Sequence, residues 1–241
     1  MYSVPVERSD AANLTLSEIL WKDTVHVSCW MVFPLQAISL RIKIPYTLFL
    51  LVFIPVYWIR YGPENFLWFS DFALFGTLAA LWVESSLLAS MMTVGVLMFD
   101  VIWCVVFVHS LMRGGSTDGL VGYMFDPQVS LFIRTLSLFR VALPVVQLWT
   151  LNKLGYDPRA CKYQAVLGWL LLMVTYAVSD PKNNINWVFG VANIAQEWLP
   201  PPLYLVALMV VYPALVCYPT HRILIRFFAR PRILDFQEVC H

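Results

Sequence analysis

The fold of this chain is decided by residues 94–146, which read VGVLMFDVIWCVVFVHSLMRGGSTDGLVGYMFDPQVSLFIRTLSLFRVALPVV. They join two apolar stretches, Ser86–Ser110 and Val129–Leu151, through a glycine-rich turn at residues 114–119. Each stretch is long enough for a membrane helix, which needs roughly 20 apolar residues. Charged residues nevertheless interrupt both stretches: Asp100, Arg134 and Arg140. We therefore expect two membrane helices that carry buried charge.

The composition of the whole chain also favours a bilayer as its solvent. Of 241 residues, 60% are hydrophobic and 13% are charged, whereas about 25% are charged in soluble domains. The net charge of +1 gives no reason to expect a nucleic acid partner. The four histidines and five cysteines are scattered without metal-ligand spacing, so we expect no metal and no other cofactor.

The pattern predicts an all-α, polytopic transmembrane bundle with six spans. Residues 1–43 are expected to form an extension, residues 44–220 the bundle, and residues 221–241 a basic cytoplasmic tail. The expected spans are Ile44–Ile59, Phe66–Val83, Ser86–Ser110, Val129–Leu151, Ala160–Val178 and Pro202–Tyr218.

An additional apolar segment, Val25–Leu40, precedes these spans. It has only about 16 residues and contains Pro34 and Gln36, which is short for a membrane crossing. We expect an interfacial or re-entrant helix there, and the alternative is a seventh span that would move the N-terminus outside.

Lysine and arginine are distributed unequally between the loops. The loops on one side carry nine of them and those on the other side carry three, a bias that marks the cytoplasmic side. Both termini are then expected in the cytoplasm, most simply at the plasma (inner) membrane of a bacterium. The basic tail is expected to lie on membrane lipids through four residues: Arg222, Arg226, Arg230 and Arg232.

Counting residues from the helix ends places the intramembrane charges at matching depths. Asp71 and Arg134 each lie about 7.5 Å below the outer surface, and Asp100 and Arg140 lie about 15–16 Å below it. The counting predicts two ion pairs, Asp71–Arg134 and Asp100–Arg140. The expected buried polar cluster consists of Asp71, Asp100, Arg134, Ser137, Arg140 and Gln147. Glu84, between the second and third spans, is expected to be solvated.

Three roles are open for this cluster. Neutralised pairs would fix the packing of the helices, as buried polar groups do in some proteins. An open polar site at the outer leaflet would offer arginines to a carboxylate or a phosphate. A proton relay through Asp100 is the third. The loop before the last span could cover such a site as a lid, through Asn184, Asn186 and Trp187, or it could be an ordered re-entrant loop.

Several motifs resemble a family of uncharacterised bacterial polytopic membrane proteins. The resemblance spans about residues 58–225 and implies a helical membrane fold without a known activity. It rests on five stretches: Tyr61–Asp71, Leu136–Phe139, Leu154–Asp157, Asn184–Gly190 and Tyr218–His221.

A weaker resemblance is to YwaF-type membrane proteins, which are distantly similar to intramembrane lipid hydrolases and acyltransferases. It rests on Ser70-Asp71 at the start of a helix and on the pattern around Phe139. That likeness implies a buried histidine after Phe139, where this chain has Arg140. Arginine stays protonated and cannot act as a general base at neutral pH, which argues against lipid hydrolysis.

No known catalytic motif occurs in the sequence. We therefore expect a non-catalytic accessory or structural protein, with membrane lipids and other membrane protein subunits as partners. The alternative is a membrane-embedded enzyme or binding protein for a lipid or small amphiphile at an outer-leaflet pocket. A transporter is the third hypothesis, and the lack of a visible internal repeat counts against it.

Overall fold

The structure is a computed structural model that describes residues 38–115, 117, 119–191 and 196–228. Within these residues every regular element is a helix. The predicted N-terminal helix lies outside them except for its last three residues, 38–40. The tail residues Arg230 and Arg232 also lie outside the described residues.

The first part of the described chain forms three helices and one short turn. They are α2 (Leu40–Tyr61), the 3₁₀ turn η1 (Pro63–Leu67), α3 (Phe69–Val83) and α4 (Ser86–Met112). The second part is more broken: η2 (Gly122–Met124), α5 (Leu131–Ser137), α6 (Phe139–Leu154), α7 (Ala160–Val178), η3 (Ile185–Trp187), α8 (Pro201–Val211), the π-helix η4 (Tyr212–Cys217) and α9 (Tyr218–Phe228).

Five helical segments in the described residues are long and apolar enough to cross a membrane. They are α2, α4, α5 with α6, α7, and the run from α8 to α9. The chain is thus a multi-pass helical membrane protein. The second predicted span, Phe66–Val83, is shorter than expected, because residues 63–67 wind into a 3₁₀ turn and leave only the 15 residues of α3. At 1.5 Å per residue, α3 is about 22 Å long.

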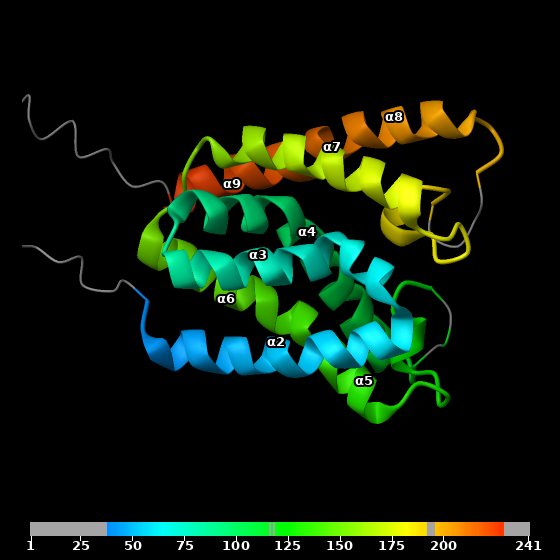
Figure 1. The fold of residues 1–241 in the computed structure, drawn as a ribbon, viewed down its shortest axis with the longest axis horizontal. Helices are drawn as coiled ribbons and strands as arrows, with labels where there is room; N and C mark the ends of the chain where they lie inside the picture. Colours follow the sequence, from blue (N-terminus) through cyan, green and yellow to red (C-terminus); the bar gives the residue numbers. More distant parts are fainter. Residues whose placement is uncertain (1–37, 116, 118, 192–195, 229–241) are drawn as a thin grey trace, which may run out of the picture. The chain divides into compact units, whose positions relative to one another are not determined.

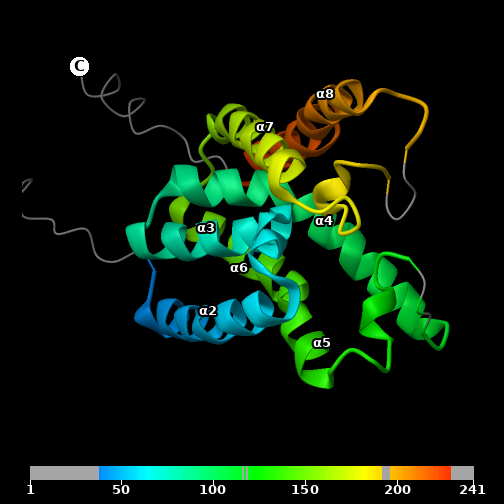
Figure 2. The same ribbon diagram turned by 45° about the vertical axis from the view of Figure 1, so that its right-hand side comes forward.

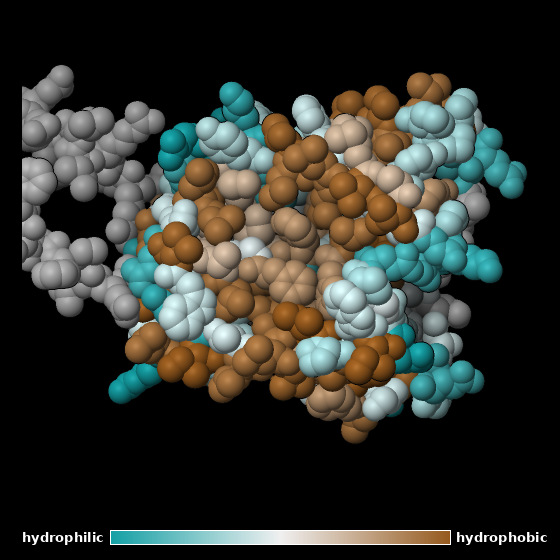
Figure 3. Space-filling view, viewed as in Figure 1, coloured by the Kyte–Doolittle hydropathy of each residue, from teal (hydrophilic) through white to brown (hydrophobic). Residues whose placement is uncertain are grey.

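The helices run back and forth between two ends of the bundle (Figure 1). We define the first end by Ser39, Glu84, Gly155–Asp157 and Phe228. The second end holds residues 62–68, 113–115, 117, 119–130 and 179–191. The face in Figure 3 is apolar across its middle, and hydrophilic residues gather towards both ends, as expected for a protein that crosses a bilayer.

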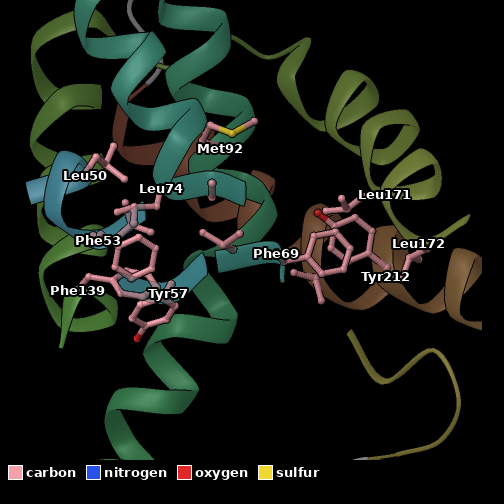
Figure 4. Packing of buried hydrophobic residues seen from close by; sticks show 14 of the residues in the cluster. Leu50, Phe53, Tyr57, Phe69, Leu74, Met92, Phe139, Leu171, Leu172 and Tyr212 are labelled. Carbon is pink, nitrogen blue, oxygen red and sulfur yellow. The ribbon is translucent and has the colours of Figure 1, made fainter. Parts of the chain in front are cut away.

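Helix α4 lies at the centre of the bundle and packs against α3, α6, α7 and η4 (Figure 2). Residues 92–96 are all buried, as expected for a helix that is surrounded on every side. Aromatic side chains fill the space beside it in two groups (Figure 4). Phe53 stacks on Tyr57 and meets the edge of Phe139, and Phe69 stacks on Tyr212 with ring centres 4.5 Å apart.

The predicted helix Val129–Leu151 starts at Leu131, extends to Leu154 and is interrupted at Leu138. The Leu138 N–H bonds to the carbonyl of Thr135 instead of the residue four positions back, so the chain tightens there. Pro144 lies just beyond this break and has no N–H for the Arg140 carbonyl. That carbonyl accepts a hydrogen bond from the thiol of Cys104 on α4 at 3.6 Å, which links α4 to α6.

The last predicted span, Pro202–Tyr218, continues as helix to Phe228. Within it, Pro213 cannot donate to the Met209 carbonyl, and the turn widens into the π-helix η4. The indole N–H of Trp169 on α7 donates to this carbonyl at 2.6 Å. Each of these two interior prolines therefore frees a carbonyl that a neighbouring helix uses.

Candidate functional site

The buried charges gather in the half of the bundle near its second end. Asp71 lies in the first turn of α3, Asp100 lies in α4, and Arg140 lies in the first turn of α6. Both carboxylates are fully buried, and the Arg140 side chain is 15% exposed. Burial of such groups inside apolar helices is costly, so they are normally paired or functional.

Arg140 is the partner of Asp71. Its Nη2 lies 3.7 Å from Asp71 Oδ1, and the side chain of Asn65 in η1 donates to Asp71 Oδ2 at 3.0 Å. The predicted pairs Asp71–Arg134 and Asp100–Arg140 are therefore wrong as direct ion pairs. The depth count assumed one unbroken helix from Val129, and the break at Leu138 invalidates it.

Asp100 forms its hydrogen bond with Ser70, which the expected cluster did not include. The Ser70 hydroxyl donates to Asp100 Oδ1 at 2.7 Å. Asp100 Oδ2 and Asp71 Oδ1 are buried and accept no hydrogen bond from the described residues. The charge of Arg140 acts on both carboxylates. Ser70 and Asp71, adjacent in sequence, thus link two carboxyl groups from α3 and α4.

Arg134 lies away from this centre. Its Nη1 donates to the Met124 carbonyl at 3.3 Å, so it bonds to the loop between α4 and α5. Its Nε is buried and has no hydrogen-bond partner in the described residues. Arg134 precedes the break at Leu138 and Arg140 follows it, so the two arginines have different surroundings.

Two aromatic side chains complete the surroundings of Arg140. The hydroxyl of Tyr123 lies 3.5 Å from Arg140 Nη1, and the guanidinium carbon lies 4.7 Å from the ring centre of Phe139. Such a cation–π contact stabilises a guanidinium that is partly removed from water. Tyr123 belongs to an irregular loop, so no helical period in the sequence could identify it.

Ser137 and Gln147 are buried, but neither bonds to an arginine. The Ser137 hydroxyl lies 2.6 Å from that of Tyr57 on α2 and donates to the Ile133 carbonyl. The Gln147 amide donates to Thr77 on α3 at 3.2 Å. They therefore connect α5 to α2 and α6 to α3.

The candidate lid is attached to the start of α3. Asn186 accepts the Phe69 N–H at 3.0 Å and donates to the Leu67 carbonyl at 2.7 Å. Asn184 bonds within the loop, to the Phe189 N–H and the Gly190 carbonyl. The Trp187 carbonyl accepts the hydroxyl of Tyr204 at 3.0 Å. Asn184 and Asn186 both have positive φ, a conformation that asparagine tolerates well.

The first end contains a buried ion pair that the sequence did not indicate. Lys43 Nζ lies 2.6 Å from Glu84 Oε1, with side chains 2% and 21% exposed. Glu84, expected to be solvated, instead connects the start of α2 to the turn between α3 and α4. Its backbone φ of 53° places this residue in the left-handed region.

Most of the other charged side chains at the first end are basic and exposed. Arg159 donates several hydrogen bonds to the Asp157 carboxylate, with Nη2–Oδ2 at 2.8 Å. These hydrogen bonds raise the pKa of the guanidinium. Tyr156 bonds to His221 at 2.7 Å, and burial raises the pKa of its hydroxyl. Arg222 and Arg226 lie exposed on α9. The predicted lipid contact of these arginines stays a prediction.

In the described residues, no group of three or more histidine, cysteine, aspartate or glutamate side chains could hold a metal ion. Comparisons with protein-family models, curated proteins and solved structures give no match for this chain.

Proposed function

We propose that this chain is a non-catalytic accessory or structural protein within a larger membrane assembly, at the inner membrane of a bacterium. The observation that carries the proposal is the Asp71–Arg140 pair, which joins α3 to α6. Asn65, Tyr123 and Phe139 extend the pair to η1, η2 and the aromatic core. An arginine held by internal partners suits the fixing of helix packing better than the capture of a substrate.

The arrangement of the motifs supports the proposed kinship with bacterial polytopic membrane proteins. The stretches Tyr61–Asp71 and Asn184–Gly190 meet through Asn186 and the start of α3. The stretches Leu154–Asp157 and Tyr218–His221 meet through the Tyr156–His221 bond. Motifs far apart in sequence thus form contacting pairs, as expected if they mark the packing of a shared fold.

The test is the mass of the protein recovered from its native membranes. After mild solubilisation, size-exclusion chromatography with light scattering should give a protein mass well above the 27.7 kDa of one chain. A harsher detergent should reduce the protein mass to that of one chain, as the control for detergent contribution. A particle that contains a single chain and no other protein in the mild detergent would contradict the proposal.

A second candidate function is the binding or turnover of a lipid or small amphiphile at the second end. Its support is Arg134, whose Nε has no hydrogen-bond partner in the described residues, and the partial exposure of Arg140. Native mass spectrometry should then detect an anionic lipid whose occupancy falls several-fold in Arg134→Gln and is unaffected by Arg60→Gln. Turnover further requires that Asp71→Asn or Asp100→Asn change the lipid profile of the cell. Unchanged profiles would rule out the enzyme.

A further inference from the structure

The charges around Asp71 and Asp100 do not balance. Two fully buried carboxyl groups face a single guanidinium among the described residues, that of Arg140. Arg134 lies away from the two carboxyl groups and bonds to the Met124 carbonyl. The remaining titratable neighbours on the surrounding elements are neutral in their ordinary states: Tyr46, Tyr57 and Tyr61 on α2, Cys104 on α4, Tyr123 in η2 and Tyr212 in η4.

The hydrogen bonds to the two carboxyl groups are also incomplete. Asp71 Oδ2 accepts from Asn65 and Asp100 Oδ1 accepts from Ser70, while one oxygen of each carboxyl has no hydrogen-bond donor in the described residues. An ionised carboxylate has about four acceptor positions, and leaving a buried charge unsatisfied is costly. With both groups ionised, the cluster would keep one uncompensated negative charge within the apolar bundle.

We propose that Asp71 and Asp100 together bind one proton, so that the cluster of two carboxyls and Arg140 is neutral. The proton comes from solvent and resides on one of the two carboxyl groups. The pair interacts electrostatically and shares Arg140, so it titrates as one unit. This site is independent of the proposed assembly role, since it rests on charge balance alone.

Removing one charge at a time changes the expected number of protons in a definite way. In Asp71→Asn or Asp100→Asn, the remaining carboxylate balances Arg140 and no proton is needed. In Arg140→Gln, both carboxyls must be protonated to reach neutrality. In Arg140→Lys, the cationic charge is kept and one proton remains. If the two carboxyl groups were buried for packing alone, their number of bound protons would not change in this order.

Infrared spectroscopy of the purified protein at pH 7 tests the series, because a protonated carboxyl has a C=O stretch that shifts in D₂O. The wild type should show the band of one group, and each aspartate variant should lose it. Arg140→Gln should double the band, and Arg140→Lys should keep it single even where the glutamine variant does not fold. Glu64→Gln, in a half-exposed carboxylate, is the matched control and should leave the band unchanged.

Two results would overturn the proposal. One is a wild-type protein without any protonated carboxyl at pH 7, which would mean that both groups are ionised. The other is a band that persists undiminished in both aspartate variants, which would place the proton elsewhere. Both results are independent of the mass measurement that tests the assembly role.

Discussion

At the scale of single residues, the structure distinguishes what a sequence can say about buried charge from what it cannot. The apolar context of Asp71, Asp100 and Arg140 predicted that they would be buried or nearly so. Two of their partners, Asn65 and Tyr123, come from irregular segments that follow no helical period. Residue counting along an ideal helix could not supply them.

Lys43 is a second buried charge whose partner the sequence does not indicate. Its position beside Arg41, at the edge of an apolar stretch, predicts an exposed loop cation, yet its side chain is almost fully buried against Glu84. A cation in the first turn of a helix can fold inward when the next loop supplies an acid. Because the whole of α2 and α3 separates the two residues in the sequence, no local pattern indicates their pairing.

Lys43→Met should lower the free energy of unfolding by about 1–3 kcal/mol, because it leaves the Glu84 carboxylate without its buried partner. Because the Glu84 side chain is 21% exposed and water reaches it, the loss of stability should lie towards the lower end of this range. Thermal unfolding in detergent measures the change.

The double variant Lys43→Met/Glu84→Gln completes the cycle and should recover part of the loss. Arg159→Met, at the exposed pair with Asp157, is the control and should change the stability far less, because water already solvates that pair. Equal losses at the two pairs would contradict the burial of Lys43.

At the scale of elements, helices α4, α7 and η4 meet at glycines. An added Cβ at Gly168 would lie 2.2 Å from the ring of Tyr212, and one at Gly95 would lie 2.3 Å from the amide of Gln164. The Gln164 amide donates to the Tyr212 hydroxyl at 2.9 Å, and that hydroxyl donates to the Gly95 carbonyl at 3.3 Å. Close packing of backbones at glycine, joined by a polar contact, is a common way to hold membrane helices together.

Gly168→Ala should destabilise the protein by about 1–3 kcal/mol, since the stacked ring of Tyr212 has no room to move. Gly76→Ala is the matched control, because its Cβ would meet the flexible side chain of Met92, which can rearrange. Thermal unfolding of both variants provides the measurement. A loss at Gly76 equal to that at Gly168 would speak against the role of Tyr212.

The attachment of the loop to α3 rests largely on Asn186. Asn186→Ala should cost about 1–3 kcal/mol, because the Phe69 N–H and the Leu67 carbonyl lose their partner. Asn186→Gly keeps the positive φ without strain and so measures the lost hydrogen bonds alone. Amide hydrogen exchange at Phe69 should rise in both variants, and unchanged protection would contradict the attachment.

The elements themselves were predictable to different degrees. Ala160–Val178 agrees with the prediction at both ends, since no proline interrupts it. The break at Leu138 and the π-helix at Tyr212–Cys217 were not predicted. Proline and local hydroxyl groups change the hydrogen bonding within an apolar run without altering its hydropathy, and hydropathy was the main signal.

At the scale of the whole molecule, the passes of the described chain place Ile38 and Phe228 at the same end (Figure 1). Alternation of long apolar runs with short loops was enough to predict this up-and-down arrangement. The exposed basic residues Arg41, Lys153, Arg159, Lys162, Arg222 and Arg226 lie at the first end, as the loop count implied. Their position relative to the cytoplasm stays a prediction.

Impermeant thiol labelling of intact cells tests that prediction. Lys182→Cys, at the second end, should label from outside, and Lys162→Cys, at the first end, should label only after the membrane is permeabilised. Both are lysine-to-cysteine changes at exposed sites, and the wild-type signal is the background. Equal labelling of the two in intact cells would contradict the orientation.

The shared dependence of Asp71 and Asp100 on Arg140 has a consequence for synthesis. Arg140 leaves the ribosome only after both acids and the whole loop between α4 and α5 have been made. At about 5–20 residues per second, Asp100 waits roughly 2–8 seconds for its cation, and Asp71 waits longer. During that interval the two buried aspartates of the α3–α4 hairpin lack the guanidinium of Arg140. The hairpin must enter the lipid with both acids protonated, or stay within the insertion machinery until α6 is made.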